Sequence, residues 1–165
     1  DYENKIKEAI DGRYKNCLNS TEVKIGFNDS SSILDYINLS NINPKLIHYP
    51  LFVHHDLALG KDGDAAGTAI IAVANDAINS DLSNSEETDS WKFIPVMWCA
   101  IRSTNKGVAI PFYKIRDCIT DLRDKYGFNI LAISADGYQS VEMLQQYTLK
   151  GYNTFQISML YLPPN

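Results

Sequence analysis

Residues 50–73 read PLFVHHDLALGKDGDAAGTAIIAV. Two apolar runs, Leu51–Val53 and Thr68–Val73, flank a stretch rich in glycine and aspartate, which is typical of two strands joined by a tight polar turn. An acid, Asp56, interrupts the apolar part of the first strand. Burying a carboxylate is costly unless another group pairs with it or binds it, so we expect Asp56 to have a partner, and a metal ion is the candidate.

The composition is that of a globular protein. The chain has 165 residues, 45% hydrophobic and 21% charged, which favours one domain with a substantial core. A net charge of −5 argues against binding nucleic acid by bulk positive charge, but it is compatible with a nuclease whose carboxylates bind cations. The three cysteines are widely spaced without a CxxC pair, which argues against a zinc site or a disulfide framework and favours a reducing compartment.

Residues 1–49 are predicted to form a linker or arm region. Apolar residues at helical spacing predict a short amphipathic helix in residues 1–16. Ser31 and Ser32 are suited to cap a second short helix that carries Ile33 and Leu34. Because the chain begins with aspartate rather than methionine, we expect it to be part of a longer protein.

The remainder of the chain alternates between predicted strands and helices. After a solvated acidic loop at 79–90 we expect a strand at 91–102, with Pro95 at an edge or bulge, and then a helix at 111–126. We expect a buried strand covered on both faces at 128–135, a second helix at 139–150 and a last strand at 152–157. The order β-β-β-α-β-α-β predicts an α/β fold in which helices flank a mixed sheet.

Two acids occupy corresponding positions in this order. Asp56 lies in the first strand and Asp136 ends the fourth. Strands one and four can be neighbours in such a sheet, which would bring the two carboxylates side by side, where they repel unless divalent cations hold them. Oxygen ligands select Mg²⁺ or Mn²⁺, and a pair of such ions can cleave a phosphodiester. Asp64 and its neighbour Asp62 could add a ligand or orient one.

Each of these residues also has a simpler explanation. Aspartate before glycine, as at Asp136, often forms only a turn or a helix cap, and acids in a glycine-rich turn, such as Asp64, often make local hydrogen bonds. Asp56 resists this explanation, because a position within a strand supplies no obvious hydrogen-bond donor. His54, on the same face as Asp56, and His55, on the opposite face, are interpreted as packed histidines.

Two motifs resemble the nuclease domain of tailed-bacteriophage terminase large subunits. HHDLALGKDGDAAGTAI, residues 54–70, resembles the first catalytic motif, in which an apolar strand delivers an aspartate before a Gly-Asp-Ala-Ala-Gly turn. ISADGYQSVEMLQQYTLKG, residues 133–151, resembles the second, an Asp-Gly-aromatic-Gln-Ser run that opens a helix ended by glycine. The resemblance covers residues 50–165, and residues 1–49 would correspond to the linker between motor and nuclease.

The resemblance implies an RNase H-like fold and an endonuclease that cuts concatemeric double-stranded viral DNA during genome packaging, with two Mg²⁺ or Mn²⁺ ions. Asp56, Asp136 and Asp64 would be its catalytic metal ligands, while Gln139 and Ser140 would shape the helix start. The implied partners are double-stranded DNA, the ATPase motor domain of the same full-length protein, the small terminase subunit and the portal, in the host cytoplasm and away from any membrane.

The sequence departs from the family pattern in two respects. The Walker motifs of the motor are absent. The third acid of the family normally follows the last strand, whereas no acid follows Glu142 here, so we expect the nuclease domain to lack its C-terminal part.

Three other interpretations remain open. Another RNase H-like nuclease, such as a resolvase or integrase core, would use the same acids, although the Gly-Asp-Ala-Ala-Gly turn favours a terminase. An actin-like nucleotide-binding module would use the turn from Asp62 to Thr68. A non-catalytic DNA-binding scaffold would pair Asp56 with a buried histidine. Under any DNA-binding interpretation, the expected basic contacts are Lys92, Arg102, Lys106 and Lys114.

Overall fold

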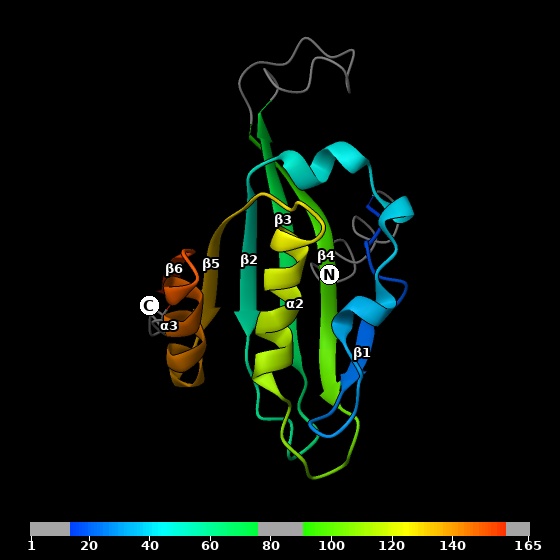
Figure 1. The fold of residues 1–165 in the computed structure, drawn as a ribbon, viewed down its shortest axis with the longest axis vertical. Helices are drawn as coiled ribbons and strands as arrows, with labels where there is room; N and C mark the ends of the chain where they lie inside the picture. Colours follow the sequence, from blue (N-terminus) through cyan, green and yellow to red (C-terminus); the bar gives the residue numbers. More distant parts are fainter. Residues whose placement is uncertain (1–13, 76–90, 158–165) are drawn as a thin grey trace, which may run out of the picture.

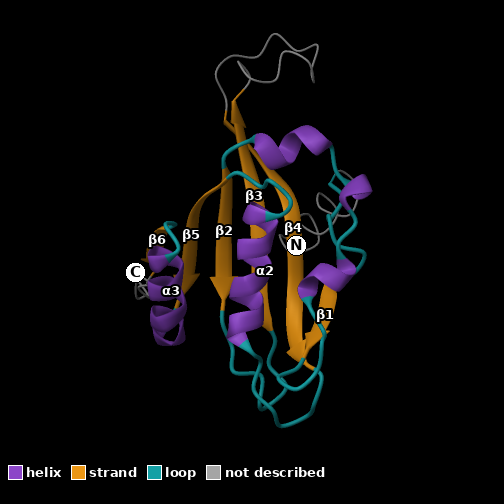
Figure 2. Cartoon of the chain, viewed as in Figure 1, coloured by secondary structure: helices purple, strands orange, loops and turns teal. Residues whose placement is uncertain are grey.

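The computed structural model describes residues 14–75 and 91–157, so most of the predicted first helix and the whole predicted loop at 79–90 lie outside the described residues. The described chain is an α/β protein with one mixed sheet (Figure 2). Its strands are β1 (Glu22–Ile25), β2 (Leu51–Asp56), β3 (Ala66–Asn75), β4 (Trp91–Ser103), β5 (Ile130–Asp136) and β6 (Asn153–Ile157). Its α-helices are α2 (Phe112–Asp124) and α3 (Val141–Leu149), and its 3₁₀ helices are Ile33–Tyr36, Leu39–Asn41, Pro44–His48 and Tyr138–Ser140.

The strands are arranged in the order β1-β4-β3-β2-β5-β6 (Figure 1). β3 is antiparallel to both of its neighbours, and the other three pairings are parallel. The predicted β2–β3 pair and the predicted adjacency of the first and fourth strands, β2 and β5, are therefore confirmed. The connection between β2 and β3 is an extended loop of residues 57–65 rather than the tight turn that was predicted.

Pro95 lies at a bulge in β4, as predicted. The β3–β4 register skips Val96, because Ile70 is opposite Met97 and Ile71 is opposite Pro95. A proline cannot donate a backbone hydrogen bond, and an irregularity in the ladder accommodates this. On the other side of β4 the Val96 carbonyl accepts a hydrogen bond from the Cys17 amide at 2.9 Å, so β4 is an interior strand here, not an edge.

Both α-helices lie on one face of the sheet (Figure 1), where the sequence predicted cover on both faces. The apolar stripe of α2, formed by Ile115, Cys118, Ile119 and Leu122, is buried against the sheet. Met143, Leu144 and Tyr147 are the buried residues of α3, whereas its terminal apolar residues Val141 and Leu149 are exposed.

The part of the predicted arm that the structure describes contributes to the same sheet and core. β1 adds a strand beside β4, and Val23 and Ile25 point into the core. Ser32 caps the 3₁₀ helix that follows, and the reciprocal contact from Asp35 completes a capping box. A strand of four residues in a stretch rich in serine and asparagine gives too short an alternation to be recognised from sequence.

The three cysteines lie in the core as free thiols. Burial raises the pKa of the Cys17 and Cys99 thiols to about 12 and that of Cys118 further above its ordinary value. Because the thiolate is the reactive form, these buried thiols are expected to be inert to oxidation and labelling while the protein is folded.

A buried hydrogen-bonded histidine joins β2 to β3 and α3. His55 is fully buried, and its Nδ1 lies 2.9 Å from Thr68 Oγ1 while its Nε2 lies 3.1 Å from the Tyr147 hydroxyl. Both ring nitrogens therefore have a partner, which a neutral imidazole satisfies with one donor and one acceptor. Burial, and to a lesser extent the neighbouring His54, lower the pKa of His55 from 6.5 to about 3.

This histidine makes stability depend on pH. Above pH 6.5 His55 is neutral in both the folded and the unfolded protein, whereas between pH 6.5 and 3 only the unfolded chain binds a proton at this residue. The free energy of unfolding should therefore fall by up to about 1.4 kcal/mol for each pH unit below 6.5. Urea unfolding at pH 7.5, 6.5, 5.8 and 5.0 measures this slope above the range in which most carboxylates titrate. His55→Gln should flatten it, and an equal slope in the two proteins would contradict the assignment.

Candidate functional site

Asp56 and Asp136 end two neighbouring parallel strands. β2 and β5 are in register with His54 opposite Ser134 and His55 opposite Ala135, and the next residues along the two strands are Asp56 and Asp136. Side chains alternate along a strand, so both acids share the open face of the sheet with His54 and Ser134. The predicted adjacency of the two strands that carry these acids is therefore confirmed.

The environment of Asp56 differs from the prediction. Asp56 is the last residue of β2 and is exposed, so burial does not force it to have a partner. After Asp56, residues 57–59 leave the sheet and enter the loop. Nor does Asp56 pair with a buried histidine, because His55 points to the opposite face and is bonded to Thr68 and Tyr147. The contact between Asp56 and a buried histidine that the non-catalytic scaffold interpretation expected is therefore not made by His55.

Gly67 faces Asp56 from β3. It is the residue opposite Asp56 in the antiparallel pair, and a Cβ atom added to Gly67 would lie 3.6 Å from the Asp56 Cβ. This is an ordinary van der Waals distance, so glycine is not required there for folding. Its effect is to leave the space over the Asp56 carboxylate open.

Asp62 and Asp64 lie in the loop of residues 57–65, and both are exposed. The loop and the start of the 3₁₀ helix after β5, including Gly137 and Gln139, line one hollow at the end of the sheet. Two contacts position the loop: the Ile110 amide donates to the Leu59 carbonyl at 2.9 Å, and Arg102 Nη1 donates to the Gly63 carbonyl. Asp64 is therefore placed at the same end of the sheet as Asp56 and Asp136.

The described residues contain no group of three or more histidines, cysteines or acids close enough to hold a metal ion together. Asp56 and Asp136, at neighbouring strand ends, could instead supply two of the ligands of one cation. Mg²⁺ is commonly bound by one or two carboxylates, with water and substrate oxygens completing its shell, and Mn²⁺ accepts similar oxygen ligands. Two hard oxygen donors on an open sheet face match that chemistry, with Asp64 nearby rather than in contact.

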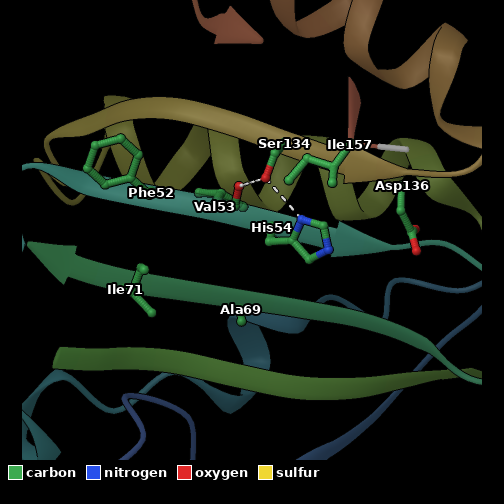
Figure 3. A pocket seen from close by; sticks show the side chains of 8 residues that line it. All are labelled: Phe52, Val53, His54, Ala69, Ile71, Ser134, Asp136 and Ile157. Carbon is green, nitrogen blue, oxygen red and sulfur yellow. Dashed lines mark hydrogen bonds between the residues drawn. The ribbon is translucent and has the colours of Figure 1, made fainter. Parts of the chain in front are cut away.

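Beyond this carboxylate pair, an apolar hollow of about 340 Å³ extends over the open face (Figure 3). Figure 3 shows Phe52 at one end of the hollow and Asp136 at the other, with Ala69 and Ile71 of β3 along its side. The hollow is therefore mostly apolar, and its polar lining residues are His54, Ser134 and Asp136.

His54 also lines this hollow, and its Nδ1 is held 2.9 Å from Ser134 Oγ, which itself lies 3.3 Å from the Val53 carbonyl (Figure 3). Sequence analysis assigned His54 to packing. The same analysis placed His54 on the face of Asp56 by their alternation along the strand, and the structure confirms this placement.

The residue that follows Asp136 shapes the helix start. Gly137 adopts φ 71°, a left-handed conformation that glycine tolerates, and turns the chain out of β5. Its carbonyl accepts hydrogen bonds from Ser140 Oγ at 2.7 Å and from Gln156 Nε2 at 3.1 Å. Ser140 thus connects the 3₁₀ turn before α3 to the end of β5, but its side chain makes no cap hydrogen bond to α3.

The basic residues expected to contact DNA differ in their surroundings. Lys106 is exposed and, with Lys61 and Arg102, lines the hollow between the 57–65 loop and the 103–107 connection. Arg102 also bonds Glu22 at 3.3 Å. Lys114 is mostly shielded, and its ammonium bonds Asp29 Oδ1 at 3.1 Å and the carbonyls of Asp29 and Ser31 at 2.8 Å. Lys114 thus anchors the segment after β1.

Comparisons with protein-family models, with curated proteins and with solved structures gave no match. In the described part of the chain, no helix is both long and apolar enough to cross a membrane.

The surroundings of Lys114 and Lys106 predict different effects of the same substitution. Hydrogen bonds from Ser31 and Lys114 hold the pKa of the Asp29 carboxyl below its ordinary value, because they stabilise its charged form. Lys114→Ala removes the cation and leaves two carbonyls without their donor, so it should lower the melting temperature by several degrees. Lys106→Ala should leave it unchanged. Equal melting temperatures in a thermal unfolding assay would show that Lys114 is no anchor.

Proposed function

We propose that this chain is a metal-dependent DNA endonuclease domain of the terminase large-subunit type, with an RNase H-like fold. One observation carries the proposal: the parallel register of β2 and β5 extends to His55 and Ala135, and the next residues of the two strands are Asp56 and Asp136. The two resembling motifs, far apart in sequence, thus meet at one end of the sheet. Three consecutive antiparallel strands followed by alternating helix and strand, as the resemblance implied, support the same proposal.

The proposed chemistry is phosphodiester hydrolysis. Bound Mg²⁺ or Mn²⁺ would activate water and stabilise the leaving oxygen. Asp56 and Asp136 would hold the cation from two rigid strand ends, and Gly67 would keep the approach to them open. Asp64, on the positioned loop, would orient water or a further cation rather than share the first one.

The proposed substrate is double-stranded viral DNA. Lys61 and Lys106 border the hollow beside the 57–65 loop and would contact phosphates, which bind basic side chains irrespective of sequence. By the same resemblance, the proposed partners are the ATPase motor of the full-length protein, the small terminase subunit and the portal, in the host cytoplasm.

Cleavage of supercoiled plasmid tests the proposal. We expect nicked or linear product in Mn²⁺ or Mg²⁺ and none in EDTA. Asp56→Asn and Asp136→Asn should each reduce the rate at least about a hundredfold, because a two-metal site depends on each carboxylate ligand. Asp117→Asn, an exposed acid on α2, is the matched control and should cut at the normal rate.

Metal binding provides a second readout that does not need catalysis. Saturating Mn²⁺ should raise the melting temperature of the unmodified protein and of Asp117→Asn, but not that of Asp56→Asn. Cleavage that persists in EDTA, or that survives both strand-end substitutions, would reject the proposal. So would the absence of both cleavage and any shift with Mn²⁺.

Access to Asp56 can be tested without changing an acid. In Gly67→Val, the Cβ would touch the Asp56 Cβ without a clash, and its methyl groups would cover the carboxylate. Valine also suits a strand, so the melting temperature should stay the same or rise while the Mn²⁺-dependent shift and cleavage are lost. Ala69→Val, two residues further along the same face, is the control. If Gly67→Val retains full activity, the open space over Asp56 has no role in binding.

A further inference from the structure

His54 and Ser134 form a hydrogen-bonded pair on the open face of the sheet. His54 Nδ1 lies 2.9 Å from Ser134 Oγ, which lies 3.3 Å from the Val53 carbonyl oxygen (Figure 3). His54 and Ser134 are opposite each other in the parallel register of β2 and β5. Asp56 and Asp136 follow two residues later on the same face, about 7 Å along each strand. The pair therefore borders the candidate cation site.

The direction of these hydrogen bonds fixes the tautomer of His54. A carbonyl oxygen can only accept a hydrogen bond, and a serine hydroxyl has one hydrogen to donate. The Ser134 hydroxyl therefore donates to the Val53 carbonyl, and its oxygen accepts from His54. The proton of the neutral imidazole consequently lies on Nδ1, while Nε2 keeps its lone pair.

The second ring nitrogen of His54 faces the site. Figure 3 shows the ring in the hollow, with Nε2 on the side toward the Asp136 end. His54 does not join Asp56 and Asp136 as a third direct ligand, because the described residues contain no three such groups close enough to share one ion. Nε2 is therefore a hydrogen-bond acceptor that adjoins the two carboxylates without acting together with them.

The chemistry of DNA limits what this acceptor can bind. The phosphate, ester and deoxyribose oxygens of DNA accept hydrogen bonds and donate none, and the donors of DNA lie on the base edges in the grooves. A bare nitrogen is therefore unsuited to bind the backbone at the bond that is cut. A water molecule that attacks phosphorus, in contrast, brings O–H donors to this position.

We propose that His54 is a catalytic residue whose Nε2 orients the attacking water, and that Ser134 is a positioning residue that acts through His54. The inference rests on the proposed nuclease function. In the reaction, the water oxygen bonds to phosphorus and the bond from phosphorus to the leaving oxygen breaks. One proton of the water reaches that oxygen through solvent, and His54 accepts a hydrogen bond throughout.

The tautomer can be measured on the full chain without metal or DNA. Long-range proton–nitrogen correlation spectra at pH 8 distinguish protonated from bare ring nitrogens, and His54→Asn identifies the His54 signals among the three histidines. The unmodified protein should show the proton on Nδ1, as should Ser134→Thr, which keeps the hydroxyl. Ser134→Ala should place a larger share of the proton on Nε2, because the hydroxyl that holds it on Nδ1 is gone.

Cleavage rates test the role of Nε2. An asparagine amide reaches only as far as Nδ1, whereas a glutamine amide reaches the position of Nε2. His54→Asn and Ser134→Ala should each lower kcat about tenfold, the effect of one hydrogen bond that orients the water. His54→Gln and Ser134→Thr, the matched controls, should stay within about threefold of the unmodified protein. All four should keep the rise in melting temperature with Mn²⁺ that Asp56→Asn loses.

The same variants show whether Nε2 binds a different donor. The 2′-hydroxyl of RNA can donate a hydrogen bond where deoxyribose cannot. If Nε2 binds that hydroxyl instead of water, the protein will cut an RNA–DNA hybrid faster than DNA, and His54→Asn will remove this preference. That result would overturn the inference.

Three further results would overturn it. The first is an unmodified protein with the proton on Nε2, and the second is equal cleavage of DNA by the unmodified protein and His54→Asn. The third is loss of the Mn²⁺ shift in His54→Asn, which would make His54 a ligand. Failure of the proposed function is distinguishable, because the unmodified protein then cuts no DNA. The role in orienting water falls with it, whereas the spectra still decide the tautomer.

Discussion

The register of β2 within the sheet is the constraint on which the candidate site depends. Successive side chains of a strand point to opposite faces, so a slip of one residue would turn His55 to the open face and Asp56 toward the helices. His55 opposes such a slip, because both of its ring nitrogens have buried partners, on Thr68 of β3 and Tyr147 of α3. A displaced His55 would leave these groups unpaired, which is costly in a buried environment. A residue with no contact to the acids thus fixes where they stand.

Because side chains alternate along β2, the two faces of this strand have different roles. One face of β2 carries Leu51, Val53 and His55 and is covered by helices, which supplies most of the core. The other carries Phe52, His54 and Asp56 and borders an apolar hollow. The acids therefore sit on a rigid support whose stability is largely independent of them. Substitutions at Asp56 and Asp136 should consequently be informative about function rather than folding.

Most strands of the sheet could be predicted from the sequence, because long apolar runs are strong local features. The helix α2 could be predicted because Pro111 and Gly127 stand at its two ends. Sequence analysis also predicted that the strands carrying Asp56 and Asp136 would be adjacent, since topology rules allow the first and fourth strands to be neighbours. It failed where the answer depended on three-dimensional context. The burial of Asp56 depends on where the strand stops, the role of Lys114 depends on Asp29 and Ser31, and β1 is too short to show a period.

The topology also has a consequence for the order of folding. β2 and β3 are joined by one loop, so their pairing closes only a short segment of chain. β3, β4 and α2 separate β2 from β5 in the sequence, so the pairing of β2 with β5 closes a much longer segment. Long-range parallel pairings are entropically slow to form. The two carboxylates are therefore expected to meet late, when the hairpin and α2 are already in place. A nascent or partly folded chain would carry both acids without the arrangement that the proposed chemistry requires.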